Sequence, residues 1–216
     1  MITFGEVWKK ELLRISKRTK KRINPKKDWT FKDYTSFEID TMLAFYIIRK
    51  LIDGKKVTNQ IISTNIKGRK YKSSGIKVNL LNDHRISELF DFKKPIKQNF
   101  NMKFLINQFV HSYIFYPVLS FVDEGRLKFT DLTEHNVTDE ELEVIYENSK
   151  RELESVLFTS DDKRNEFIYE ININDLIKIY ESVGHCEINS WSYEYNEKKL
   201  DYDVKLEYDK NTDFPF

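Results

Sequence analysis

The 216-residue chain is 40% hydrophobic and 33% charged, with a net charge of +1, and its 6 Gly and 4 Pro exclude a low-complexity, disordered chain. Its single cysteine, Cys186, excludes an internal disulfide, and no apolar run reaches the about 18 residues that a membrane-spanning helix needs. The N-terminus has no leader pattern, so we expect a cytoplasmic protein without membrane contact.

Two helices are predicted in the first quarter of the chain. Thr3 and Glu6 stand at capping-box spacing, and the apolar residues after them recur at helical spacing, which predicts a helix over about residues 4–20. A second pair at the same spacing, Thr35 and Glu38, begins a stretch that is apolar on every side. This stretch predicts a buried helix.

The middle of the chain is expected to alternate between strand and helix. Residues 59–81 are rich in β-forming residues, whereas residues 100–116 have the pattern of a second, nearly all-round apolar helix. Pro117 should end that helix, because proline disfavours helical backbone in the residue before it. Residues 118–132 then predict a hairpin with Gly125 in the turn.

The remaining residues predict two further helices and more strands. Thr138 and Glu141 repeat the capping-box spacing. The expected elements are an acidic helix over about 139–151, strands at 154–160 and 166–172, a helix capped by Asn174 that stops before Gly184, and a hairpin formed by 187–195 and 200–208.

These elements predict an α+β protein, with buried helices in the N-terminal half followed by antiparallel β-hairpins with two further helices. The charge sign changes near residue 117, which suggests a basic, mainly helical half at 1–117 and an acidic, β-rich half at 118–216. One continuous domain is the alternative.

Charge is distributed very unevenly along the sequence. Residues 1–111 contain 25 Lys and Arg against 10 Asp and Glu, a net charge of +15, whereas residues 112–216 contain 11 against 25, a net charge of −14. This asymmetry predicts a basic surface for an anionic partner, an acidic surface for a cationic partner, or two surfaces that meet. The alternative is a fold in which the halves interleave and the charges average out.

Two basic clusters are candidate nucleic-acid-binding sites, because cations that neutralise phosphates release bound counterions. The clusters comprise Lys17, Arg18, Lys20, Lys21 and Arg22 near the end of the first helix, and Lys67, Arg69, Lys70 and Lys72 around Tyr71. Cations near a helix C-terminus also suit the helix dipole, so a solvated helix end is the alternative for the first cluster.

Asn107 and His111 are four residues apart in the apolar run 104–115, so on a helix they share one face. Either this pair is hydrogen-bonded within the core, or it belongs to an active site. The segment INQFVH (106–111) resembles the signature of the HEPN superfamily, in which an arginine and a polar residue precede a histidine on a helix. The resemblance implies a metal-independent ribonuclease in a bacterial conflict or defence system.

Ile106 stands where the resemblance would require the arginine. A phosphate transition state needs positive charge or fixed donors where negative charge develops, and isoleucine supplies neither. Arg49, on the other helix expected to be buried, is therefore the candidate cation beside Asn107 and His111 in a catalytic site. Without such a substitute, the site would bind RNA or a partner without cutting it.

No cofactor and no metal site is expected. The four histidines and Cys186 lack zinc-ligand spacing, and no glycine-rich nucleotide-binding motif is present. Asp203 and Lys205 superficially resemble a nuclease motif, but no partner carboxylate motif precedes them at a typical spacing, and ordinary strand alternation accounts for them. The polar loop 159–165 is either a functional loop or a simple turn.

The sequence is compatible with two functions. The first is an RNA-associated, HEPN-like protein that is weakly catalytic or non-catalytic. The second is a non-catalytic protein–protein interaction subunit, whose acidic half contacts a basic partner or the basic half of another copy in a homo-oligomer.

Overall fold

The computed structural model describes residues 4–26, 29–122, 127–128, 138, 140, 144, 147–188 and 190–207. Its described helices are α1 (Gly5–Arg22), α2 (Phe31–Asp53), α3 (Asn59–Ile62), α4 (Ile86–Leu89), α5 (Met102–Val110) and α8 (Ile173–Gly184). Its described strands are β1 (Asn65–Lys72), β2 (Ile96–Asn101), β3 (Ser112–Phe121), β4 (Leu127–Lys128), β5 (Arg151–Ser160), β6 (Phe167–Asn172), β7 (Ser190–Asn196) and β8 (Asp201–Glu207). The α+β prediction is confirmed.

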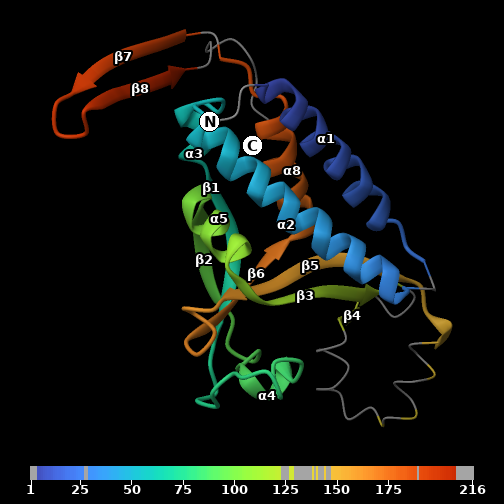
Figure 1. Cartoon of the computed structure of the whole chain (residues 1–216). Coiled ribbons are helices and arrows are strands. Elements are labelled where there is room, and N and C mark those ends of the chain that lie inside the picture. Colours follow the sequence, from blue (N-terminus) through green and yellow to red (C-terminus); the bar gives the residue numbers. More distant parts are fainter. Residues whose placement is uncertain are drawn as a thin grey trace.

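One antiparallel sheet organises the chain, with the strand order β2-β1-β6-β5-β3-β4. Helices α1, α2, α5 and α8 lie over one face of this sheet, and the β7–β8 hairpin extends away from it (Figure 1). Strands β1 and β2 precede residue 117, strands β5 and β6 follow it, and Pro117 itself lies within β3. The basic and acidic halves of the sequence therefore share one sheet.

The first helix agrees with the prediction, but the second begins earlier than expected. Thr30, not Thr35, caps α2: its hydroxyl accepts a hydrogen bond from the Asp33 amide at 3.3 Å, and the Asp33 carboxylate accepts one from the Thr30 amide at 2.9 Å. The Thr35 hydroxyl instead donates to a carbonyl in the first turn. The expected Thr3 cap of α1 lies outside the described residues, and Phe4 occupies the N-cap position.

The helix predicted over residues 100–116 is present only at Met102–Val110, and its second half is strand instead. Helix α5 is capped by Asn101, whose side chain accepts from the Phe104 amide at 2.7 Å, and it ends at Val110. The residues after His111 are aromatic and β-branched, and they pair with β5 instead. Pro117 fits in β3 because, among the described residues, only Ser120 and Phe121 of this strand pair with β4 on its other side.

The C-terminal elements were largely predicted correctly. Strands β5 and β6 pair as an antiparallel hairpin, and β7 and β8 form the expected second hairpin. Helix α8 is capped by Asn172 rather than Asn174, because the Asn172 side chain accepts from the Asn174 amide at 2.9 Å. Gly125 and six of the thirteen residues of the expected acidic helix over 139–151 lie outside the described residues, and Arg151 belongs to β5.

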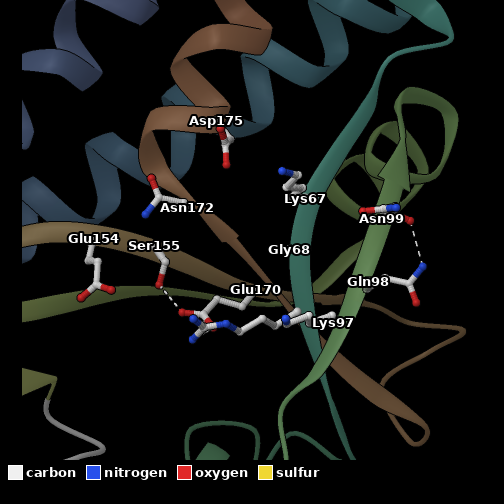
Figure 2. Close-up of a pocket in the computed structure, with 11 residues that line it drawn as sticks. Lys67, Gly68, Lys97, Gln98, Asn99, Glu154, Ser155, Glu170, Asn172 and Asp175 are labelled. Atoms are coloured by element: carbon white, nitrogen blue, oxygen red, sulfur yellow. Dashed lines mark hydrogen bonds and ion pairs between the residues drawn. The ribbon is translucent and has the colours of Figure 1, made fainter. Parts of the chain in front are cut away.

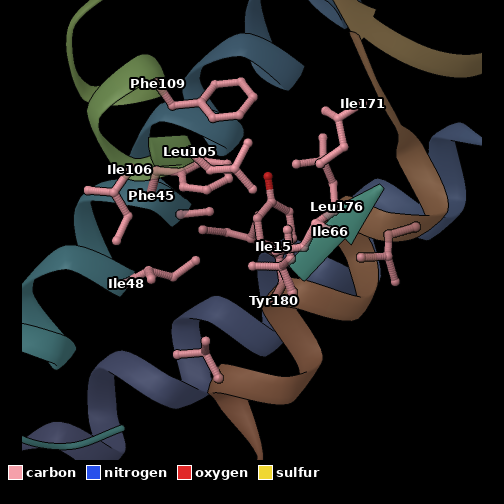
Figure 3. Packing of buried hydrophobic residues seen from close by; sticks show 14 of the residues in the cluster. Ile15, Phe45, Ile48, Ile66, Leu105, Ile106, Phe109, Ile171, Leu176 and Tyr180 are labelled. Atoms are coloured by element: carbon pink, nitrogen blue, oxygen red, sulfur yellow. The ribbon is translucent and has the colours of Figure 1, made fainter. Parts of the chain in front are cut away.

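An aromatic stack joins the helices to the sheet at the centre of the main core, and Figure 3 shows its members Phe45, Phe109 and Tyr180. Phe109 of α5 stacks on Phe45 of α2, with 4.2 Å between ring centroids, and on Phe158 of β5 at 4.4 Å. Tyr180 of α8 meets Phe45 edge-on at 6.1 Å. Each buried aromatic side chain contributes roughly 1.5–3 kcal/mol to folding, so this stack fixes the helices firmly on the sheet.

A second, smaller hydrophobic cluster covers part of the opposite sheet face. The segment after β1, with Val78, Leu89 and Phe90, packs there against Tyr71 and Ile168. Among the described residues, this cover extends over only one end of the face. The rest of that face, across β1, β2, β5 and β6, carries polar side chains and forms the pocket described next.

Candidate nucleic-acid interface

A pocket of about 610 Å³ lies where β1 and β2 meet β5, β6 and the first turn of α8 (Figure 2). Its volume falls within the range of about 300–1,000 Å³ that is typical of small-ligand sites. It is lined by Lys67, Gly68, Arg69, Lys97, Gln98, Asn99, Glu154, Ser155, Glu170, Asn172 and Asp175.

Strand alternation and register bring these residues together. Ile66 and Phe100 point into the helix-covered core, so the residues that alternate with them point to the other face of the sheet. On that face, Arg69 of β1 lies directly between Lys97 of β2 and Glu170 of β6 in the strand register. Side chains that are distant in the sequence therefore become neighbours only when the strands pair.

Glu170 forms the buried floor of the pocket, with only 8% of its side chain exposed. Its carboxylate accepts a hydrogen bond from the Tyr71 hydroxyl at 2.5 Å and one from the Ser155 hydroxyl at 2.7 Å. The Arg69 Nη1 atom lies 3.8 Å from the same carboxylate. These partners offset the cost of removing a carboxylate from water.

The same contacts determine the protonation states of the Tyr71 and Arg69 side chains at the floor of the pocket. Burial, together with the neighbouring Glu170 carboxylate, raises the pKa of the Tyr71 hydroxyl above its ordinary value. The phenol therefore keeps its proton and acts as a donor. A hydrogen bond with Tyr71 and the charges of Glu170 and Glu154 raise the pKa of Arg69, although burial opposes this change. Arg69 is thus a charged side chain beside the floor, with 54% of its side chain exposed.

Two further cations stand at the rim of the pocket. Lys67 and Lys97 are exposed, and neither forms an ion pair with a described residue. Asp175, by contrast, pairs with Lys178 of its own helix at 3.1 Å. The two lysines are therefore available to an anionic ligand, with the Asn99 side chain exposed beside them.

A β-bulge sets the position of Glu154. Val118 pairs with Ser155, but the next residue, Leu119, pairs with Leu153, so Glu154 is the extra residue in β5. Such bulges redirect side chains and are common next to functional sites. The bulge places Glu154 at the pocket beside Ser155.

Gly68 allows β1 to pass close to its neighbours behind the pocket. A Cβ atom at this position would overlap the Phe100 ring and would lie 2.5 Å from the backbone oxygen of Glu170. Any larger residue would therefore push Phe100 out of the main core or move β6 away from β1.

The basic cluster of α1 is largely occupied by contacts within the protein. Asp40, which is 7% exposed, accepts from Arg18 and Arg22, each with a shortest distance of 2.7 Å, and Lys20 pairs with Glu181 at 2.6 Å. Burial favours protonation of Asp40, but the two arginines outweigh it and lower the pKa of Asp40. Three cations of the cluster therefore attach α1 to α2 and α8.

Lys17 and Lys21 are the members of the α1 cluster that remain exposed without an ion pair to any described residue. The β1 cluster is also divided, by strand alternation. Lys67 and Arg69 line the pocket, whereas the Lys70 Nζ atom lies over the Phe167 ring at 4.6 Å and Lys72 is exposed outside the pocket.

The Asn107–His111 pair is exposed, not buried as the core interpretation expected. His111 forms the C-cap of α5, and its backbone amide donates to the Asn107 carbonyl at 3.2 Å. In this segment Gln108 is a buried polar residue, and its side chain accepts a hydrogen bond from the Ser160 amide at 3.0 Å. Ile106 is 6% exposed in the main core.

Arg49 was expected to be a buried cation, but its side chain is exposed on α2. The loop between β5 and β6 is a compact turn in which Arg164 pairs with Asp161 at 2.6 Å and lies over the Tyr113 ring at 4.0 Å. These contacts account for two charged residues of the 159–165 loop through local structure.

Four residues that line the pocket could not be identified from the sequence: Lys97, Asn99, Glu154 and Glu170. Lys97 and Asn99 precede a predicted helix and carried no local signal, and Glu154 and Glu170 fitted ordinary strands. Only the strand register, which is non-local, assigns them to the pocket with Arg69.

Within the described ranges, no group of three or more His, Cys, Asp or Glu side chains is arranged to hold a metal ion. Nor does any helix in those ranges have both the length and the apolar character needed to cross a membrane. No protein-family model, curated protein or solved structure matches the chain.

Proposed function

We propose that this protein binds RNA through the pocket on the open sheet face, as a nucleic-acid-associated protein without an assigned reaction. The observation that carries the proposal is the convergence of Lys67, Arg69 and Lys97 from two strands onto one polar pocket. Phosphate contacts by such cations supply most of the affinity in RNA and DNA binding.

The phosphate would lie between the two lysines that have no ion pair with a described residue. Lys67 and Lys97 offer exposed ammonium groups at the rim, while the Arg69 guanidinium lies beside Tyr71 and Glu170. A pocket of about 610 Å³ accommodates one nucleotide of a strand rather than a double helix. The favoured ligand is therefore a single-stranded segment.

The carboxylates in the pocket favour RNA over DNA. A ribose 2′-hydroxyl can donate to a carboxylate, and it is the group by which proteins distinguish RNA from DNA. Glu154 and Asp175 stand at the pocket with the phosphate-binding lysines. The Asn99 amide offers both a donor and an acceptor to a base edge.

Competition binding tests the proposal directly. A labelled single-stranded RNA is titrated with the protein at several salt concentrations, and unlabelled DNA of the same sequence then competes for it. We expect measurable affinity that falls steeply with salt, and weaker competition by DNA than by RNA. The absence of binding at low salt would refute the proposal.

The HEPN-like function and its bacterial conflict or defence setting remain a prediction. His111, Asn107 and Arg49 are all exposed, so a solvent-accessible reaction site stays compatible with their positions. They do not line the pocket, so RNA binding there does not depend on them.

A further inference from the structure

The β7–β8 hairpin has one face made entirely of aromatic and aliphatic side chains. Its cross-strand pairs on this face are Trp191 with Leu206, Tyr193 with Val204, and Tyr195 with Tyr202. The opposite face carries Ser190, Ser192, Glu194, Asn196, Asp201, Asp203 and Lys205. The sequence predicted this hairpin and the alternation of its strands.

Within the part of the chain that the structure describes, the apolar face is covered only at its base. Leu206 is 5% exposed, and β8 packs there against α3. Farther out, Trp191, Tyr193, Tyr195 and Tyr202 are 60%, 62%, 52% and 56% exposed. The hairpin extends from the rest of the molecule (Figure 1), so these four rings form a patch that the described part of the chain leaves open to solvent.

We propose that this face, defined by Trp191, Tyr193, Tyr195 and Tyr202, is a dimerisation surface that packs against the same face of a second copy of the chain. A two-stranded hairpin is only marginally stable in water, and a second apolar layer would stabilise it. Two copies related by a two-fold axis would bury both faces in a four-stranded sandwich.

Charge favours a second copy over an RNA strand or a highly charged protein. Residues 190–207 contain five acidic residues and three lysines, so the hairpin repels polyanions. All six positions of the apolar face are uncharged. The equivalent face of another copy has the same character, and the acidic faces then point outward, away from each other.

The available area predicts a weak dimer. A buried aromatic side chain covers about 150–250 Å². With four rings slightly more than half exposed, each copy would bury roughly 350–570 Å², and the pair roughly 700–1,150 Å². This range reaches the about 1,000 Å² that a specific interface requires, so dimerisation should depend on concentration.

Sedimentation velocity over a range of protein concentrations tests this proposal. We expect the mass to approach that of a dimer as protein concentration rises. Raising the salt concentration to about 1 M should not weaken the dimer, because salt does not screen an apolar contact. The variant Tyr193→Thr/Tyr195→Thr keeps strand-forming residues but removes two rings. We expect its dimer dissociation constant to rise about a hundredfold, or about 1.4 kcal/mol per ring.

The control is Leu80→Thr/Leu81→Thr, which removes two residues that are 82% and 84% exposed on a distant loop. This control should dimerise as the wild type does, and far-UV circular dichroism verifies that both variants fold. Trp191 emission of the wild type should also shift to the red on dilution.

Three results would overturn the proposal. They are a monomer at every concentration, a dimer that dissociates in high salt, and a dimer that the tyrosine variant retains. If that variant instead loses RNA binding while the wild type stays monomeric, the hairpin is a base-stacking surface. The test does not involve the pocket, so its outcome is independent of the proposed function.

Discussion

The Tyr71 hydroxyl donates a 2.5 Å hydrogen bond to the Glu170 carboxylate across two paired strands, and this bond joins the second hydrophobic cluster to the floor of the pocket. Tyr71 and Glu170 are both buried, so water cannot readily replace either partner. The pocket is consequently a rigid part of the sheet rather than a loop that forms around a ligand.

Replacing Tyr71 with phenylalanine should lower the free energy of unfolding by about 1–3 kcal/mol, because a buried carboxylate loses a donor while the packing is kept. Chemical denaturation measures this change. Tyr46→Phe on α2, where the ring is 44% exposed, is the matched control and should change stability little. Equal stability of Tyr71→Phe and wild type would show that the bond contributes nothing to the floor.

Replacing Gly68 with alanine should destabilise the protein by about 1–3 kcal/mol, since the new methyl group would overlap the Phe100 ring within a packed core. Thermal unfolding provides the measurement. A melting temperature at or above that of the wild type would mean that β1 and Phe100 can separate at no cost.

Acidic pH should remove the stabilisation that Asp33 provides at the N-terminus of α2. Burial favours the neutral form of Asp33, but hydrogen bonds from Lys26 and Thr30 outweigh this and lower its pKa from 3.8 to about 2. Because the folded pKa is the lower one, the stabilisation is fully present above pH 3.8 and is lost as pH falls toward 2. The stability difference between wild type and Asp33→Asn should therefore shrink over this pH range. A constant difference would contradict the assignment.

Replacing His111 with alanine should leave the melting temperature and the RNA affinity nearly unchanged, because its side chain is exposed and lies outside the pocket. Melting curves and RNA titrations check both expectations. If the wild type cleaves RNA and this variant does not, His111 is catalytic and the HEPN resemblance extends to activity.

Elements with a strong local pattern could be predicted from the sequence. Helix α1 has apolar residues at helical spacing, and β7 and β8 alternate strictly, so their own residues specify them. Helix α5 and strand β3 could not be separated in this way. Both contribute to hydrophobic clusters, and a continuous apolar run does not show where helix changes to strand.

The candidate site was predicted only in part. Lys67 and Arg69 were identified because they cluster with other cations, but their neighbours come from distant strands. For the α1 cluster, the sequence likewise could not show which cations contact other parts of the protein. Arg18 and Arg22 bind Asp40 of α2, and that contact depends on how the helices pack and not on any local pattern.

The proposed RNA site at the pocket is tested most directly by measuring the RNA affinity of two double variants as a function of salt concentration. Lys67→Ala/Lys97→Ala removes two cations at the pocket, and Lys17→Ala/Lys21→Ala removes two equally charged residues from α1. We expect only the first variant to bind RNA more weakly, with a slope of log affinity against log salt reduced by about 1–2. An equal loss of RNA affinity in both variants, or a loss of RNA affinity only in the α1 variant, would contradict an RNA site at the pocket.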